Sequence, residues 1–234
     1  MMSETTPIGG PHALLDIKEN VARVRRRIER AAERCGRDAA RIQLLAVTKT
    51  VDPRTIAAAI DAGLREFGES YVQEAKEKIP KVSGARCWHL VGHLQRNKAS
   101  DAVRLFATLH SIDSLSLAEG LARRARAEGR DIDIFTQVNL AGEKTKRGFK
   151  ADELEDAVEE IRRLSGLRLR GLMAVPPYER DPEEARPYFR RLRNLAERHN
   201  LPDLSMGMTH DFEIAIEEGA TIVRVGTAIF GPRR

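Results

Sequence analysis

Apolar side chains recur along this chain with two different spacings. Between residues 14 and 35 they come every three or four positions, as at Ile17, Val21 and Val24, and Gly36 then provides a stop. This spacing predicts an amphipathic helix at the N-terminal end. After it, short apolar runs of strand length alternate with longer segments that have helical periodicity.

Eight of the apolar runs have the length of a buried strand. They lie at residues 42–48, 65–69, 87–92, 108–112, 131–140, 167–175, 203–207 and 221–227. Helical patterns follow near residues 53–62, 70–79, 97–103, 114–128, 151–164, 182–199 and 211–218, with a last turn from Ala228. Strands that alternate with helices pair in parallel through right-handed crossovers, so eight such units predict a closed (β/α)8 barrel. An open sheet is the alternative if two of the weaker runs, the second, fourth and seventh, fail as strands.

Length and composition favour one globular domain. A chain of 234 residues suits one core, so we expect a barrel domain at residues 13–234 and a mobile tail at residues 1–12. The chain is 41% hydrophobic and 32% charged, and no apolar run reaches the ~20 residues of a membrane span. The start has neither the basic residues nor the apolar core of a secretory signal. We therefore expect a cytoplasmic protein that does not enter a membrane.

Cysteine content and charge exclude several classes of function. The two cysteines, Cys35 and Cys87, form no CxxC motif, so we expect free thiols and neither a disulfide framework nor a zinc site. The formal charge of +5 comes from basic residues interleaved with 35 acidic ones, which favours solvated helix faces over a nucleic-acid surface. His89 and His93 lack an evident third ligand, so packing is favoured over a metal role.

A lysine closely follows the first strand. In the stretch AVTKTV, residues 46–51, Lys49 lies where the C-terminal end of a barrel strand opens into the active face. A lysine beside an apolar wall is partly desolvated and can attack a carbonyl, which defines a Schiff-base site. The alternatives are a lysine directed to solvent or one paired with an acid such as Glu69.

The loops after the last two strands are rich in small and hydroxyl-bearing residues. In (β/α)8 barrels these two loops frequently bind a phosphate. Each loop alone also suits an ordinary turn, and Asp211 is expected to be the N-cap of the helix that follows. The candidate phosphate residues are Ser205, Met206, Gly207, Met208 and Thr209 in one loop and Gly226, Thr227 and Ala228 in the other.

Arg224 interrupts the otherwise apolar strand TIVRVGT. A buried guanidinium needs an acceptor, which is either a neighbouring carboxylate or a heterocycle. Pyridoxal 5′-phosphate (PLP) satisfies all three features, with its aldehyde at Lys49, its phosphate at the two loops and its ring nitrogen at Arg224. Because arginine only donates, the ring nitrogen would be unprotonated and the ring a poor electron sink.

At these residues the chain also resembles a known family. The stretches LLAVTKT, FGESYVQEA, WHLVGHLQRNK, QVNLAGEKTKRGF, RGLMAVP and LSMGMTHDFEIAIEEGATIVRVGTAIFG are similar to motifs of the pyridoxal phosphate homeostasis proteins, from about residue 14 to residue 233. The resemblance implies a single-domain barrel like the N-terminal domain of alanine racemase and PLP bound to Lys49. It also implies a phosphate site at Ser205, Gly207, Gly226 and Thr227, with Arg224 facing the pyridine nitrogen.

The function implied by the resemblance is a reversible Schiff-base carrier of PLP. Such a protein buffers the cofactor and passes it to PLP-dependent apoenzymes without turning over a substrate, and we expect it to be a monomer. Two positions depart from the family pattern, which has Asn in place of Ser70 and Ser in place of Thr209. Ser70 shortens or removes the contact expected there with the cofactor, whereas Thr209, beside His210, keeps the hydroxyl and adds a methyl group.

Two other functions remain as alternatives. A small PLP-dependent amino acid racemase would need an acid/base tyrosine, and the chain offers Tyr71, Tyr178 and Tyr188. A Schiff-base aldolase acting on a phosphorylated sugar would need no cofactor. Further basic or polar residues that could guide a phosphate toward the mouth are Asn97, Lys98, Lys144, Lys146 and Arg147.

Overall fold

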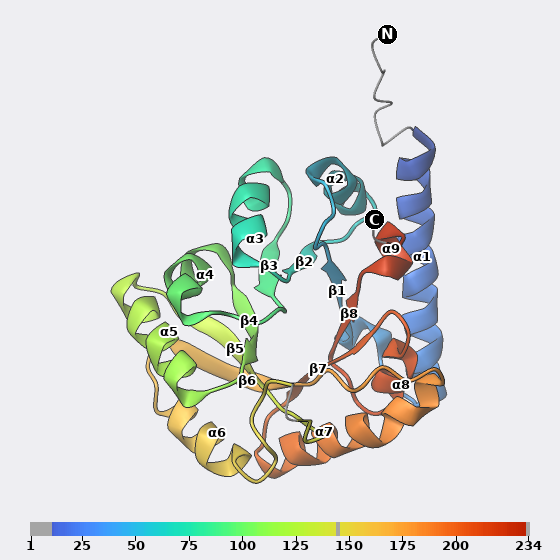
Figure 1. Cartoon of the computed structure of the whole chain (residues 1–234). Helices are drawn as coiled ribbons and strands as arrows, with labels where there is room; N and C mark the ends of the chain where they lie inside the picture. The colour runs from blue at the N-terminus through green and yellow to red at the C-terminus, as the bar shows by residue number, and fades with distance from the viewer. Residues whose placement is uncertain (1–10, 144–145, 233–234) are drawn as a thin grey trace.

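The chain forms a closed barrel of eight parallel strands (Figure 1). The computed structural model describes residues 11–143 and 146–232. The first strand pairs with both the second and the last, so the sheet has no free edge. All eight predicted strands are present, which excludes the open sheet. They are β1 (Gln43–Val47), β2 (Glu66–Glu69), β3 (Cys87–Leu90), β4 (Thr108–Ile112), β5 (Ile132–Gln137), β6 (Leu167–Met173), β7 (Asp203–Met208) and β8 (Ile222–Val225).

Helices surround the barrel, and one precedes it (Figure 1). The predicted N-terminal helix starts earlier than expected, at residue 11, and most of the predicted tail lies outside the described residues. The α-helices are α1 (Pro11–Arg34), α2 (Pro53–Asp61), α3 (Val72–Lys78), α4 (Ala99–Leu105), α5 (Leu115–Ala127), α6 (Leu154–Arg162), α7 (Arg186–Arg198), α8 (Phe212–Glu217) and α9 (Thr227–Phe230). Short 3-10 turns are η1 (Ala39–Arg41), η2 (Ile79–Lys81), η3 (Arg96–Lys98) and η4 (Pro182–Ala185).

Helix α1 packs beside α2, α8 and α9 (Figure 1). Its apolar stripe, which includes Val21 and Val24, is buried as the spacing predicted. Arg27 forms a bidentate salt bridge with Glu213 of α8, with N–O distances of 2.7 and 2.8 Å. On the side of α9, the Asn20 amide donates to the carbonyl of Ile229 at 2.9 Å. Helix α1 therefore braces the two helices that follow the last two strands.

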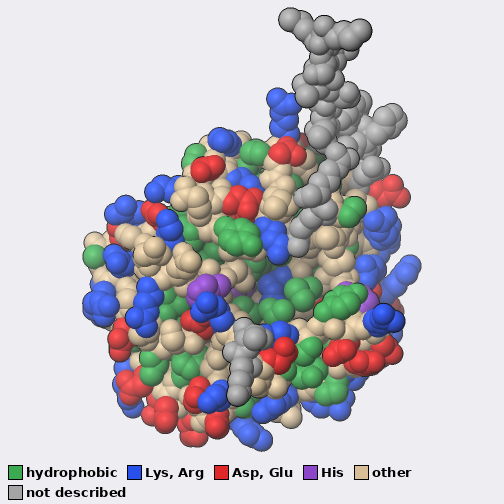
Figure 2. Space-filling model, in the orientation of Figure 1, with side chains coloured by type: hydrophobic (Ala, Val, Ile, Leu, Met, Phe, Trp, Pro, Cys, Tyr) green, Lys and Arg blue, Asp and Glu red, His purple; other side chains and the backbone are tan. Residues whose placement is uncertain are grey.

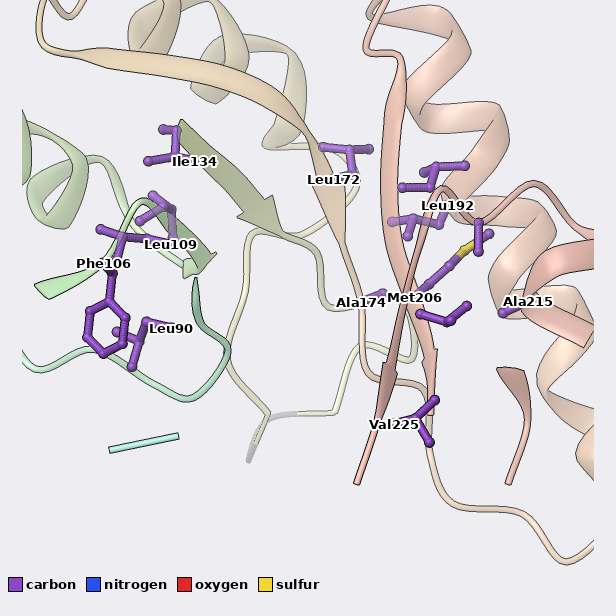
Figure 3. Close-up of a cluster of buried hydrophobic side chains, with 14 of the residues drawn as sticks. Leu90, Phe106, Leu109, Ile134, Leu172, Ala174, Leu192, Met206, Ala215 and Val225 are labelled. Atoms are coloured by element: carbon purple, nitrogen blue, oxygen red, sulfur yellow. The ribbon is translucent and has the colours of Figure 1, made fainter. Parts of the chain in front are cut away.

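Side chains of each strand alternate between the barrel interior and the helices. Figure 3 shows the helix-facing set, in which Ile134, Leu172 and Met206 belong to one large buried cluster. Their sequence neighbours Phe135 and Met173 belong instead to a small separate cluster, with Leu45 and Ile222. The interior is thus only partly apolar. Buried polar side chains also occupy the interior, among them His89, His110, Ser205 and Arg224.

An ion cluster joins α7 to α8 and supports a stability prediction. The Glu218 side chain is 5% exposed and lies 3.2, 3.0 and 3.1 Å from nitrogens of Arg186, Arg190 and Arg193. Burial alone would raise the pKa of Glu218, but hydrogen bonds from Arg190 and Arg186 outweigh it and lower the pKa. A lowered carboxyl pKa stabilises the fold above the unfolded-state pKa and loses that effect as pH falls through the folded-state pKa.

We therefore expect Glu218→Gln to lower the free energy of unfolding at pH 7 by about 1–2 kcal/mol. The deficit should shrink as pH falls from 6 to 3, because wild type loses the same stabilisation there. Urea denaturation across this pH range measures both effects. The control Glu160→Gln removes a carboxylate that is 55% exposed and should change stability by less than about 0.5 kcal/mol. An equal loss in both variants would contradict the prediction.

Candidate functional site

A cavity of about 900 Å³ opens at the C-terminal ends of the strands. Its lining has the basic side chains of Lys49, Lys98 and Arg224, and within the described part of the chain it has no Asp or Glu. Figure 2 shows this face hollowed near its centre, with Lys or Arg side chains visible in the hollow. The lining favours an anionic ligand. Six residues of the predicted site belong to it, namely Lys49, Ser70, Thr209, Arg224, Gly226 and Thr227.

Lys49 is held just beyond β1 by a strained turn. The lysine is half-buried, and the next residue, Thr50, has a φ of 63°. For a β-branched residue this left-handed conformation costs about 1–3 kcal/mol, so the surroundings must enforce it. They do so through the Thr50 N–H, which donates to Glu74 Oε1 at 2.7 Å, and through the Val51 N–H, which donates to the Thr48 carbonyl at 3.0 Å.

A second lysine, Lys78, also stabilises this turn. It was not identified from the sequence. Its buried ammonium donates to the Thr48 carbonyl at 2.7 Å, to Glu69 Oε1 at 2.8 Å and to Glu74 Oε1 at 2.6 Å. The Thr48 hydroxyl also donates to Glu69 Oε1, at 2.7 Å. Burial raises the pKa of Glu69, and the hydrogen bonds from Lys78 and Thr48 oppose that shift. The carboxylate considered as a partner for Lys49 is therefore engaged by Lys78.

Three residues predicted at the phosphate, Ser205, Met206 and Gly207, do not line the cavity. The physical reason is that all three lie within β7, where side chains alternate between the barrel interior and the helices instead of facing the mouth. Ser205 points into the barrel interior, and Met206 packs outward against the helices (Figure 3). Gly207 has a φ of 87° and contacts α8. The residues of this loop that line the cavity are Met208, Thr209 and His210.

The close packing of Gly207 supports a second stability prediction. A Cβ at this position would lie 2.5 Å from Ala215 Cβ and 2.9 Å from Phe212 Cα, on a backbone that disfavours any side chain. Gly207→Ala should lower the free energy of unfolding by about 2–4 kcal/mol. Gly142→Ala is the matched control, because Gly142 also has a positive φ, 68°, but nothing within 4 Å, and it should lose only about 1 kcal/mol. Thermal denaturation that gave equal losses would rule out the packing explanation.

The loops after β7 and β8 are in contact with each other. Asp211 stands at the N-cap position of α8, but its Oδ1 accepts from the Met208 N–H at 2.6 Å instead of capping the helix with its side chain. It thereby closes the 208–211 loop, and burial raises the pKa of Asp211. The Ala228 N–H donates to the Thr209 hydroxyl oxygen with an N–O distance of 3.5 Å, so the two loops are in contact beside Gly226.

Arg224 lies at the floor of the cavity and is buried. Its guanidinium donates to the Ser205 carbonyl at 2.6 Å, the Ser205 hydroxyl at 2.8 Å and the Ala174 carbonyl at 2.9 Å. The acceptors are therefore neutral carbonyl and hydroxyl oxygens, and not the carboxylate of the ion pair considered as an alternative. Burial lowers the pKa of Arg224 to about 10, so the group stays charged at neutral pH.

The remaining candidates take varied positions. Lys98 and His93 line the cavity, and His93 lies 3.2 Å from Asp113. Lys146 pairs with Glu143 at 3.0 Å, while Lys144 lies outside the described residues. Arg147 is 3.9 Å from Asp113, and Asn97 is exposed. Among the described residues, no group of three or more His, Cys, Asp or Glu is placed to hold a metal, and no helix is long and apolar enough to cross a membrane.

Fold and site together define a class of protein: a (β/α)8 barrel with a lysine after its first strand and an arginine on its last. The family model of the alanine racemase N-terminal domain matches residues 18–234. The pyridoxal phosphate homeostasis protein of Aquifex aeolicus is 42% identical over 223 residues, 92% of this chain and 98% of that relative. That of Escherichia coli K12 is 43% identical over 228 residues, 93% of this chain and 97% of that protein.

A solved structure gives the same result. PipY of Synechococcus elongatus, solved with PLP bound, has a TM-score of 0.82 and 35% identity, covering 92% of this chain and 100% of that chain. The chain belongs to the family of pyridoxal phosphate homeostasis proteins, within the alanine racemase N-terminal domain fold.

Proposed function

We propose that this chain binds PLP reversibly through Lys49 and acts as a carrier of the cofactor in PLP homeostasis. The observation that carries the proposal is one cavity that combines Lys49, Arg224 and the hydroxyl-bearing loops of Thr209 and Thr227 without an acidic lining residue in the described part of the chain. The PLP held by PipY, a relative of the same family, supports it. We assign this function to one domain, residues 13–234.

Each part of PLP has a matching group in the cavity. When bound, PLP supplies an aldehyde on an electron-withdrawing pyridine ring. The Lys49 amine would hold the aldehyde carbon as a Schiff base with loss of one water, and water would reverse the bond. Thr209, Gly226 and Thr227 offer hydroxyls and backbone for the phosphate. Arg224 can only donate, so it would keep the ring nitrogen unprotonated and disfavour carbanion chemistry.

A carrier also needs an open site. Tyr71 and Tyr178, which line the cavity, are 63% and 79% exposed, so the mouth is open to water.

We propose that PLP-dependent apoenzymes receive the cofactor at this mouth, and that the protein is monomeric and cytoplasmic. The thiols of Cys35 and Cys87 are both free, which suits a reducing compartment.

The test is an absorbance spectrum of the protein with added PLP before and after borohydride, followed by peptide mapping. We expect a near-visible band that reduction fixes on the peptide containing Lys49. The holoprotein should then restore activity to a PLP-dependent apoenzyme when the two proteins are mixed directly. Absence of the band would overturn binding, and a band without any transfer would overturn the carrier function.

Two tyrosines at the mouth support a second candidate, an amino acid racemase. Tyr71 and Tyr178 both line the cavity, whereas Tyr188 packs against the core. A phenol near the ring could move a proton at the substrate α-carbon. Exchange of α-protons with D₂O across an amino acid panel, lost in Lys49→Ala and in Tyr71→Phe or Tyr178→Phe, would support it. No exchange in the holoprotein would exclude it.

A further inference from the structure

A chain of hydrogen bonds runs through the barrel interior, starting at the cavity floor. Arg224 Nη1 lies 2.8 Å from Ser205 Oγ, which lies 2.8 Å from His110 Nδ1. His110 Nε2 is 2.9 Å from His89 Nδ1, and His89 Nε2 is 3.0 Å from Glu66 Oε2. These five residues come from β8, β7, β4, β3 and β2. The chain therefore links a guanidinium at the mouth to a carboxylate on the far side of the interior.

The middle of this chain is shielded from water. His110 and Ser205 are fully buried, and His89 is 4% exposed. The ring of His110 stacks on Phe135, with a centroid distance of 4.6 Å. At the far end of the chain, Glu66 and His89 both line a second cavity of about 330 Å³, together with Cys87 and Asp133.

The end groups fix the direction of every proton in the chain. Arginine can only donate, and an ionised carboxylate can only accept. His89 therefore carries its proton on Nε2, toward Glu66, and accepts at Nδ1. His110 then donates from Nε2 and accepts at Nδ1, and the Ser205 hydroxyl donates to His110 while it accepts from Arg224. Each of the four contacts receives one proton, and both imidazoles are neutral.

The opposite direction would place an additional charge in the barrel interior. If His110 donated from Nδ1 to Ser205, His89 would have to donate at both nitrogens and carry a buried positive charge. Burial, and to a smaller extent the positive charge of Arg224, hold the pKa of His110 well below its usual range, which agrees with a neutral ring. The first arrangement is therefore the stable one.

We propose that Ser205, His110, His89 and Glu66 are positioning residues that orient the Arg224 guanidinium toward the bound cofactor. Through aligned dipoles the Glu66 carboxylate acts on a charge that it does not touch. The proposal rests on the proposed function, because it assigns to Arg224 the role of facing the ring nitrogen of PLP. It gives Ser205 a task different from the phosphate contact expected from the sequence.

The first test needs no cofactor. Nitrogen-15 NMR of the cofactor-free protein should show His89 and His110 as neutral Nε2–H tautomers at pH 7, with signals assigned by comparison with His89→Gln and His110→Gln. A doubly protonated His89, or a Nδ1–H tautomer at His110, would overturn the proposed direction. This result does not depend on whether the protein binds PLP.

The second test separates positioning from general stability. His89→Leu breaks the chain, whereas His89→Gln keeps an acceptor toward His110 and a donor toward Glu66. We expect His89→Leu to raise the Kd for PLP about tenfold and to shift the near-visible band, as for loss of one charge-assisted hydrogen bond. His89→Gln should stay within about twofold of wild type. Borohydride should still fix the cofactor on Lys49 in both.

A buried residue outside the chain supplies the control. Thr136 is fully buried, and its hydroxyl has no hydrogen-bond partner among the described residues, so Thr136→Val changes the core without touching the chain. It should leave the Kd and the band unchanged. The proposal is overturned if His89→Leu retains the wild-type Kd and band, or if Thr136→Val changes them equally. No band in wild type would overturn the proposed function. The NMR result would still show whether the hydrogen bonds between Arg224 and Glu66 have the proposed direction.

Discussion

Lys49→Ala should abolish the near-visible band and the borohydride-stable adduct. The only covalent link expected between protein and cofactor would be lost, while Arg224 and the loops of Thr209 and Thr227 would remain. Residual non-covalent binding should be weaker by at least about 100-fold, equivalent to about 3 kcal/mol. Fluorescence titration with PLP, together with mass spectrometry after reduction, measures both effects.

The matched control for this experiment is Lys98→Ala. Lys98 also lines the cavity, so its removal takes away positive charge without removing the residue proposed to bind the aldehyde. We expect the band to persist and the affinity to fall by no more than about tenfold. An adduct that moved to another lysine in Lys49→Ala, or a band lost in Lys98→Ala and kept in Lys49→Ala, would refute the role given to Lys49.

Lys78→Met should produce the largest loss of stability. It would leave the carboxylate of Glu69 buried without its cation and would free the carbonyl of Thr48. Removing one member of a buried ion pair costs about 3–5 kcal/mol. Guanidinium denaturation of the cofactor-free protein measures the free energy of unfolding. The turn that holds Lys49 should also loosen, so the Kd for PLP should rise.

Two comparisons separate the buried cluster from a surface effect. Lys76→Met, on the same helix, removes a lysine that is 54% exposed and paired with Asp101, and should cost less than about 1 kcal/mol. Adding Glu69→Gln to Lys78→Met should recover part of the loss, because it removes the uncompensated charge. If the double variant were less stable than Lys78→Met by the full cost of Glu69→Gln alone, the two groups would not be coupled.

The sequence was sufficient for the fold because the chain repeats one unit. Each apolar run is short, each is followed by a helical pattern, and only a closed barrel buries both faces of eight such strands. Even the weakest runs, β2, β4 and β7, pair in the barrel. The start of α1 was missed by three residues, since helix ends depend on local contacts more than on periodicity.

The site was only partly predictable. Lys49, Arg224, Gly226 and Thr227 follow from their places at strand ends, and all line the cavity. The limit was the treatment of β7, because Ser205 and Met206 lie inside this strand, where side chains face the interior or the helices and not the mouth. Ser205 therefore turned out to contact Arg224 and His110.

Contacts between distant segments account for what else was missed. The spacing of Glu74 and Lys78 is visible in the sequence, but it also suits an exposed helix pair. Only the packing of α3 on the strands buries Lys78 and brings it to Glu69 and Thr48. Likewise, His89 and His110 could be recognised as core residues one at a time, but their mutual bond requires the barrel.

The pairing of β1 with β8 has a consequence for how the protein is made. Lys49 follows the first strand and Arg224 lies on the last one described, and the two strands are hydrogen-bonded neighbours. During synthesis, earlier segments emerge and begin to fold before β8 exists. A nascent chain can thus build most of the barrel wall while the cavity still lacks its floor. Capture of the cofactor should accordingly follow the synthesis of β8 and the closure of the barrel.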